Sequence, residues 1–174
     1  MDKYYHGTDI NSAREICNNG IIITKGKRHT DFGQGFYITD GYDRAVKRAF
    51  TRAELMNSKP AIVTVYFDEE EASSLIERFS DDLRWGRFVI NNRNGARYIR
   101  KIPFQENNLD ARYQITYGRI ADLDVVDVAR ELLQTGKMLM SLDDILNRDY
   151  PMQYAFHTEE SLKYLKSLSY QPLT

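Results

Sequence analysis

The stretch DFGQGFYIT, residues 31–39, joins a glycine-rich turn to an aromatic and β-branched run. Gly33 and Gly35 give the backbone the freedom that a tight, closely packed turn requires. Residues 36–39 are of the types that favour a strand. We therefore expect a turn that leads directly into a strand and presents Tyr37 close to the turn.

Two other short segments also combine a strand with a turn. YHGT, residues 5–8, ends a predicted strand at 3–5, and QYAFHT, residues 153–158, covers a predicted strand at 153–157. Each segment carries a polar side chain, His6 in the first and Gln153 in the second. Side chains at strand ends are commonly available for binding and catalysis.

The rest of the chain alternates irregularly between predicted helices and strands. A helix capped by Asn11 or Ser12 should end near residue 20, and a helix near 42–56 shows apolar residues at helical spacing. Further predicted elements are helices at 69–79, 81–91 and 124–133, a helix capped by Ser141, strands at 61–67 and 113–120, and a final helix opening at 158–161. This order predicts one α+β domain over residues 1–174, with small, split sheets and flanking helices.

Composition excludes several classes of protein. The net charge of −1 over 174 residues gives no overall attraction to nucleic acid or membrane. Cys17 is the only cysteine, so the chain has neither an internal disulfide nor a cysteine-based zinc site, and we expect Cys17 to be a small buried hydrophobe. The three histidines lack ligand spacing, so no metal is expected. The first residues lack the apolar run of a signal peptide and no segment is long and apolar enough to span a bilayer, so a cytoplasmic protein is expected.

Together the three segments resemble the signature of the ADP-ribosyltransferase superfamily, in the branch that contains the poly(ADP-ribose) polymerases and the diphtheria-type toxins. They are more similar still to an uncharacterised bacterial and phage family with the motifs Tyr-His-Gly-Thr, Asp-Phe-Gly-x-Gly-Phe-Tyr-x-Thr and Gln-x-x-Phe-His-Thr. The resemblance covers nearly the whole chain. It implies a split-sheet core with a cleft for NAD⁺.

The resemblance also implies roles for individual residues. His6 would bind ribose hydroxyls, Tyr37 would stack on nicotinamide, and Gln153 would bind the 2′-hydroxyl of the reacting ribose. These three are the candidate catalytic residues. The candidate cofactor-binding residues are His6, Gly7, Thr8, Gly33, Gly35, Phe36, Tyr37 and Arg48. The pyrophosphate would be held by basic residues among Lys25, Lys27, Arg28, Arg44 and Arg48.

Two positions depart from the pattern of that superfamily. Gln153 stands where most characterised members carry a carboxylate, and a neutral amide gives up both the negative charge and the ability to accept a proton. Arg48 stands where many relatives have an aromatic residue near the nicotinamide, with Phe50 close by. The uncharacterised family also carries glutamine at the first position.

Other patterns in the chain have simpler interpretations. DFG at residues 31–33 also spells the kinase metal-binding tripeptide, but the chain lacks the kinase catalytic loop. His157 is expected to pack against or cap the last helix. Residues 84–101 are the densest basic region, either a solvated surface or a track for nucleic-acid phosphates, while Trp85 and Phe88 have the spacing of a core stripe.

The leading hypothesis is therefore mono-ADP-ribosyl transfer from NAD⁺ to a macromolecular acceptor, either RNA, DNA or protein. The resemblance and the small size suggest a bacterial or phage toxin, for which an antitoxin protein would be a partner. Three alternatives remain: a module that binds NAD⁺ or ADP-ribose without turnover, an NAD⁺ glycohydrolase, and a nucleic-acid-binding protein that uses residues 84–101.

Overall fold

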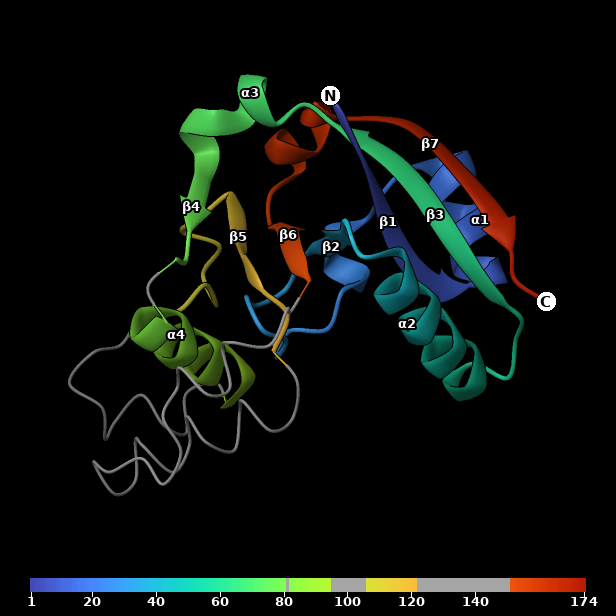
Figure 1. The fold of residues 1–174 in the computed structure, drawn as a ribbon, viewed down its shortest axis with the longest axis horizontal. Helices are drawn as coiled ribbons and strands as arrows, with labels where there is room; N and C mark the ends of the chain where they lie inside the picture. The colour runs from blue at the N-terminus through green and yellow to red at the C-terminus, as the bar shows by residue number, and fades with distance from the viewer. Residues whose placement is uncertain (81, 95–105, 122–150) are drawn as a thin grey trace.

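A computed structural model describes residues 1–80, 82–94, 106–121 and 151–174, which form a mixed sheet with helices on its faces (Figure 1). The seven strands are β1 (Asp2–Asp9), β2 (Phe36–Thr39), β3 (Pro60–Phe67), β4 (Ile76–Arg78), β5 (Ile115–Arg119), β6 (Met152–Phe156) and β7 (Leu165–Pro172). The α-helices are α1 (Ile10–Asn19), α2 (Tyr42–Leu55), α3 (Glu69–Ala72) and α4 (Asp82–Asn94), and the 3-10 helices are η1 (Ile23–Lys25), η2 (Ser73–Leu75) and η3 (Glu159–Tyr164). The predicted α+β class is confirmed.

The strands lie in the order β4-β5-β6-β2-β1-β3-β7. All neighbours are antiparallel except β4 and β5, which are parallel. β1 pairs with β3 along its whole length but with β2 only at Tyr5↔Thr39. The sequence predicted small, split sheets, whereas the described strands form one seven-stranded sheet. Its weakest pairing is the joint between β1 and β2, which share a single residue pair.

Two helices cover opposite faces of the β1–β3 half of this sheet (Figure 1). Ile62 of β3 packs with Ala45 and Ala49 of α2, whereas its neighbour Val63 packs with Ala13 of α1. Successive side chains of a strand point to opposite faces, so β3 places one apolar set under each helix. Small residues on α1 and α2 allow both helices to lie close to the strands.

The other half of the sheet carries the two larger apolar clusters. Tyr154 and Phe156 of β6 pack on one face with Phe67 of β3, and Ala155 between them packs on the other face with Trp85 and Phe88 of α4. Trp85 and Phe88 are buried, as their helical spacing predicts. The core thus continues on both faces of β6.

Three sequence predictions are wrong in detail. The cap of α1 is Asp9, whose carboxylate accepts hydrogen bonds from the backbone N–H groups of Asn11 and Ser12, the two residues predicted to cap it. Residues 69–79 form a single helical turn, a 3-10 turn and the short edge strand β4 in place of one helix. The helix predicted to open at 158–161 is the 3-10 helix η3, capped by Thr158, and the chain then continues as β7.

The helices predicted at 124–133 and after Ser141 lie outside the described residues. Cys17 is partly buried against the apolar cluster of α1, and burial raises the pKa of its thiol. No helix within 1–80, 82–94, 106–121 and 151–174 is long and apolar enough to cross a membrane.

Candidate functional site

A cleft of about 1000 Å³ opens beside the joint between β1 and β2. Its lining comes from β1, β2 and β6, from one side each of α1 and α2, from the segment between α1 and β2, from Arg93 of α4 and from residues 120–121. The volume lies at the upper end of the range of roughly 300–1,000 Å³ for small-molecule sites. His6, Tyr37 and Gln153 come from three adjacent strands and all line this cleft.

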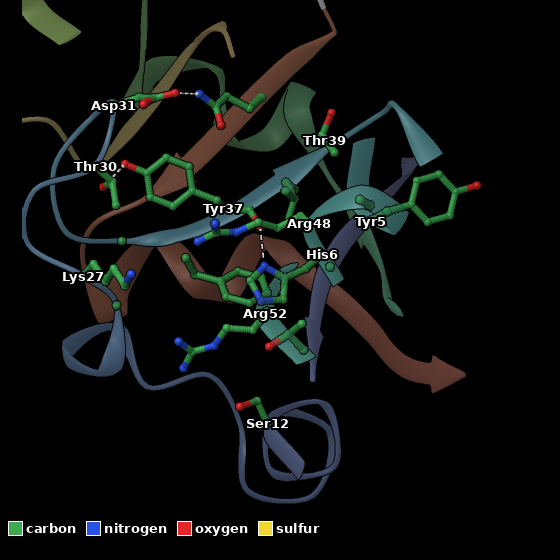
Figure 2. A pocket seen from close by; sticks show the side chains of 18 of the residues that line it. Tyr5, His6, Ser12, Lys27, Thr30, Asp31, Tyr37, Thr39, Arg48 and Arg52 are labelled. Atoms are coloured by element: carbon green, nitrogen blue, oxygen red, sulfur yellow. Dashed lines mark hydrogen bonds between the residues drawn. The ribbon is translucent and has the colours of Figure 1, made fainter. Parts of the chain in front are cut away.

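His6 lies where β1 and β2 part, and its ring stacks on Phe36 with the centroids 4.5 Å apart. The ring nitrogen Nδ1 is 2.7 Å from the backbone carbonyl oxygen of Tyr37 (Figure 2). Burial is the main cause that lowers the pKa of His6, the charges of Arg48 and Arg52 act in the same direction and the hydrogen bond to Tyr37 opposes them, so that the pKa is about 4. His6 is therefore neutral at pH 7.

The tautomer of His6 follows from its partner. A carbonyl oxygen can only accept, so Nδ1 must carry the proton of the neutral ring. Nε2 then has a free lone pair and can accept a hydrogen bond. In the described part of the chain, no donor to Nε2 is seen.

Tyr37 lines the cleft with its ring, while its hydroxyl is tied to the preceding turn. The hydroxyl donates to the carbonyl of Gly33 (2.6 Å), accepts from the N–H of Phe32 (3.0 Å) and lies 2.7 Å from Thr30 Oγ1. Burial raises the pKa of the Tyr37 phenol well above its ordinary value, and the nearby charge of Asp31 adds to this. The phenol is thus a structural anchor, and the ring is the part available to a ligand.

Gln153 lies on the same face of the sheet as Tyr37, because Thr39 pairs with Gln153 and Tyr37 pairs with Ala155. Its side-chain nitrogen Nε2 donates to Asp31 Oδ2 at 2.9 Å. Asp31 also lines the cleft. The predicted amide therefore comes with a carboxylate as its direct neighbour.

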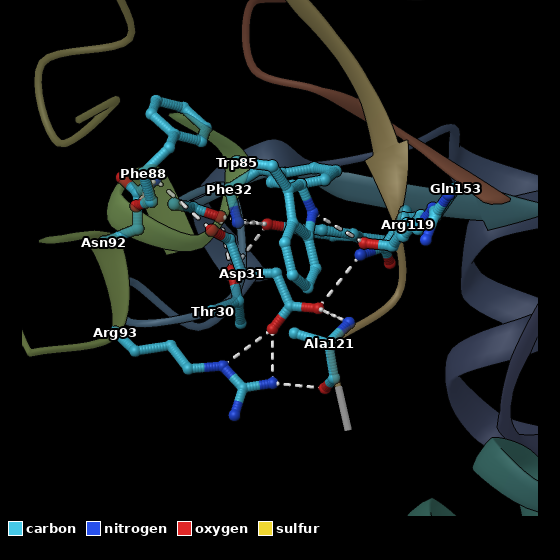
Figure 3. A network of polar contacts seen from close by, with 12 residues as sticks. Thr30, Asp31, Phe32, Trp85, Phe88, Asn92, Arg93, Arg119, Ala121 and Gln153 are labelled. Atoms are coloured by element: carbon cyan, nitrogen blue, oxygen red, sulfur yellow. Dashed lines mark hydrogen bonds and ion pairs between the residues drawn. The ribbon is translucent and has the colours of Figure 1, made fainter. Parts of the chain in front are cut away.

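Asp31 is the centre of a polar network (Figure 3). Its Oδ1 accepts from the guanidinium of Arg93, with Nε 2.7 Å away, and its Oδ2 accepts from the backbone N–H of Ala121 at 3.0 Å. Arg93 also donates to the carbonyl of Ala121. With the bond from Gln153, both oxygens of this nearly buried carboxylate are engaged.

The turn that contains Asp31 is anchored on the C-terminal end of α4. Phe32 is fully buried in the cluster of Trp85 and Phe88. Asn92, also fully buried, donates through Nδ2 to the carbonyl of Asp31. Aromatic packing and side-chain hydrogen bonds thus fix the turn that positions Tyr37 and Gln153.

The glycines of the motifs are required mainly by packing. A Cβ on Gly7 would lie 1.8 Å from the carbonyl oxygen of Ala45 in α2, and a Cβ on Gly35 would lie 2.8 Å from the carbonyl oxygen of Phe156. Gly33 has a φ of +89° and sits behind Tyr37, outside the lining of the cleft. The structure therefore does not bring Gly33 to the cleft with the other candidates, and its contact with the cofactor stays a prediction. Gly7 and Gly35 do line the cleft.

His157 has the structural role expected for it, by contacts other than a helix cap. Its Nδ1 is 2.7 Å from the carbonyl oxygen of Gln34, and its Nε2 is 2.9 Å from Thr116 Oγ1. Burial lowers the pKa of His157 to about 4. The ring thus ties the turn before β2 to the strand β5.

Cationic side chains dominate the lining of the cleft, with seven lysines and arginines against two carboxylates in a chain of net charge −1. Four of them lie on one face of α2, at spacings of three and four residues: Arg44, Lys47, Arg48 and Arg52. Figure 2 shows Arg48 and Arg52 extending from α2 toward the side of the cleft where Lys27 lies. Such a surface suits a ligand that carries phosphate groups.

The remaining sequence candidates divide between the cleft and other surfaces. Thr8 and Phe36 line the cleft, as do the predicted pyrophosphate candidates Lys25, Lys27, Arg44 and Arg48, whereas Arg28 lies outside the lining. Five charged residues of the lining were not among the candidates from the sequence: Glu15, Asp31, Lys47, Arg52 and Arg93. The position of Asp31 at the head of the central motif was the one available signal.

Some of the basic residues at 84–101 form ion pairs within the protein. Arg84 pairs with Glu106 and Glu77, and Arg93 pairs with Asp31. Arg97, Arg100 and Lys101 lie outside the described residues. In the described part of this region, Arg84 and Arg93 are thus paired within the protein, whereas the Nε of Arg87 is buried and has no hydrogen-bond partner among the described residues.

Within the described part of the chain, the cleft offers the acceptor nitrogen of His6, the half-buried ring of Tyr37, the oriented amide of Gln153 and a cationic wall. These groups can bind a phosphorylated ligand with a sugar and a flat ring. No cluster of three or more potential metal ligands is found among the described residues.

Comparison with known protein families matches residues 3–167 to a family described as "Protein of unknown function (DUF3990)". No curated protein and no solved structure matches the chain.

Proposed function

The chain belongs to the DUF3990 family of proteins of unknown function, and from this starting point we propose that its cleft binds NAD⁺ and transfers the ADP-ribose part to an acceptor. The observation that carries the proposal is the convergence of His6, Tyr37 and Gln153 on one cleft with a cationic wall. The likeness of their motifs to those of ADP-ribosyltransferases is a second, independent support.

The reaction places few covalent demands on the protein. The bond between C1′ of the ribose and the ring nitrogen of nicotinamide breaks, and its electron pair leaves with neutral nicotinamide. The ribose becomes cation-like at C1′, where a nucleophilic atom of the acceptor forms the new bond and releases its proton. Catalysis then depends on holding the sugar and the leaving group in place and on local electrostatics.

The cleft residues have groups suited to these tasks. His6 Nε2 can accept a hydrogen bond from a ribose hydroxyl, and Gln153 Oε1 can accept one from the 2′-hydroxyl. The ring of Tyr37 offers a stacking surface for nicotinamide. Because its hydroxyl is held by the preceding turn, Tyr37 contributes no acid or base.

The cations of α2 suit the pyrophosphate of the dinucleotide. Arg48 and Arg52 lie close enough to His6 to lower its pKa, which places them near the ribose end of the proposed ligand. Arg52 is 3.8 Å from Asp9, whose carboxylate is held by the start of α1. Arg48 is therefore our first choice for a phosphate contact.

The neutral amide at Gln153 keeps a second function open, namely cleavage of NAD⁺ with water as acceptor. For transfer, we propose a nucleic acid or protein as the acceptor, and a bacterial or phage toxin neutralised by an antitoxin protein as the biological setting.

The test begins with binding of NAD⁺ by calorimetry and release of nicotinamide by the protein alone. Labelled NAD⁺ is then offered with separate pools of RNA, DNA and cell protein. Label in one pool supports transfer, release without an acceptor supports hydrolysis, and binding without release supports a non-catalytic module. Variants Tyr37→Ala and Gln153→Ala, with folding checked by circular dichroism, should lose the activity. Absence of NAD⁺ binding by the wild-type protein would refute the proposal.

A further inference from the structure

Asp31 is hydrogen-bonded to Gln153. Position 153 is where most characterised ADP-ribosyltransferases, which these motifs resemble, carry a single carboxylate. The Asp31 carboxylate accepts from Gln153 Nε2 at 2.9 Å, from the Ala121 N–H at 3.0 Å and from Arg93 Nε at 2.7 Å. It lies on a separate turn, 122 residues away in sequence. Nothing in the roles assigned above requires a carboxylate here.

The contact fixes which way the Gln153 amide faces. Both ends of a glutamine amide have similar shape, and their assignment normally depends on the neighbours. The carboxylate of Asp31 accepts hydrogen bonds, so the amide group next to it is the NH₂ donor. The carbonyl oxygen Oε1 is then left as the acceptor of a residue that lines the cleft, and among the described residues no donor to it is seen.

The network around Asp31 makes this orientation rigid. Arg93 and the Ala121 N–H hold the carboxylate in place, and Phe32 next to it is fully buried. Because the Asp31 carboxylate is held in place, it also restricts the orientation of the Gln153 amide that donates to it. The negative charge therefore lies one hydrogen bond behind Gln153.

We propose that Asp31 is a positioning residue, which holds the Gln153 amide with its carbonyl oxygen facing the reacting ribose, so that the two side chains together replace a single active-site carboxylate. This inference rests on the proposed cleavage of NAD⁺. It explains the occurrence of glutamine at 153, because a glutamate there would put two carboxylates at hydrogen-bond distance, where both cannot ionise cheaply.

The test exchanges the carboxylate at residue 31 and the amide at residue 153. Each substitution nearly keeps the volume of the side chain, and the two together keep the net charge of the protein. Gln153→Glu alone should reduce kcat for nicotinamide release roughly tenfold or more and add an inflection to its pH profile, because the new pair shares a proton. Asp31→Asn alone should also reduce kcat by roughly tenfold or more with little change in KM, because an asparagine has one acceptor oxygen and cannot accept from both Arg93 and Gln153, which now compete for it. The double variant, Asp31→Asn with Gln153→Glu, should recover kcat by about threefold over either single variant and lose the inflection, because the new amide at 31 can donate to the new carboxylate at 153, although the Ala121 N–H loses its acceptor.

The matched control is Asp110→Asn, which removes a surface carboxylate that also pairs with an arginine and should leave kcat unchanged. If Asp31 served only to hold Arg93 and Ala121, the exchange would bring no rescue. A double variant no more active than Gln153→Glu would overturn the inference, and this comparison remains decisive even if Asp31→Asn alone does not fold. If the wild-type protein neither binds nor cleaves NAD⁺, both the proposed function and the role of Asp31 are wrong. If the wild type is active but the double variant is not rescued, only the role of Asp31 is wrong.

Discussion

Removing one oxygen atom, with Tyr37→Phe, tests whether the phenol is an anchor or a participant in chemistry. The hydroxyl lies between the Phe32 N–H at 3.0 Å and the Gly33 carbonyl at 2.6 Å. The ring that lines the cleft stays in the variant. The substitution therefore separates the hydrogen bonds of the turn from the stacking surface.

The expected loss of stability follows from which partners remain satisfied. The Gly33 carbonyl keeps a second donor, Thr30 Oγ1, at 2.5 Å. Phe32 is fully buried, so its N–H loses its acceptor and is shielded from water. An unsatisfied buried donor costs about 1–3 kcal/mol. At roughly 2–4 °C per kcal/mol for a domain of this size, Tm should fall by about 2–12 °C.

Thermal unfolding followed by circular dichroism measures the loss, and release of nicotinamide measures the function. Tyr42→Phe is the matched control, because its hydroxyl accepts only an exposed hydrogen bond from Gln171 and should change the free energy of unfolding by less than about 0.5 kcal/mol. Tyr37→Phe should keep its turnover at temperatures where it is folded. Undiminished stability together with lost turnover would refute the reasoning and assign the phenol to the reaction.

Three further outcomes are expected. Gly7→Ala should lower the free energy of unfolding, measured by chemical denaturation, by about 2–3 kcal/mol. The reason is that the Ala45 oxygen must move by at least 1.2 Å to lengthen its contact with the new Cβ from 1.8 Å to 3.0 Å. A fully stable variant would contradict this close packing. The unfolding free energy should fall as the pH drops from about 7 to 4, because His6 and His157, each with a folded pKa of about 4, take up protons more readily in the unfolded chain, where the pKa of a histidine is near 6.5. A flat profile in urea titrations across this range would speak against the burial of these histidines. Arg48→Gln should weaken NAD⁺ binding in calorimetry by roughly tenfold or more, whereas Arg28→Gln outside the cleft should bind like wild type; equal losses would point to a general charge effect.

The strands that build the cleft were largely predictable because their patterns are local. β2 follows a glycine turn and is rich in aromatic and β-branched residues, and β3 matches its predicted range to within one residue. β6 begins one residue before Gln153. The gathering of the three motifs around one cleft came from the family resemblance, because strand order depends on long-range pairing that periodicity leaves undetermined.

The two edge strands were missed for physical reasons. β4 has only three residues and depends on pairing with β5. In β7, Ser167 has a φ of +53° and the register against β3 shifts between Thr64 and Tyr66. This irregularity breaks the alternation of buried and exposed side chains that marks a strand in sequence.

The Asp31 network was beyond sequence reasoning because it joins separate segments of the chain. Asp31 meets Arg93 from α4 and Gln153 from β6, and each is an ordinary polar residue in its own local pattern. Only the tertiary fold brings opposite charges and an amide within hydrogen-bond distance. No local pattern therefore indicates that a carboxylate lies beside Gln153.

His6 also has a structural role at the joint between β1 and β2. The two strands share one residue pair, so the 2.7 Å bond from the imidazole to the Tyr37 carbonyl works as an extra rung that holds the halves of the sheet together. Truncating His6 would both remove an acceptor and loosen the walls on either side of it. Altered turnover in a His6 variant would then combine lost chemistry with a change in cleft width.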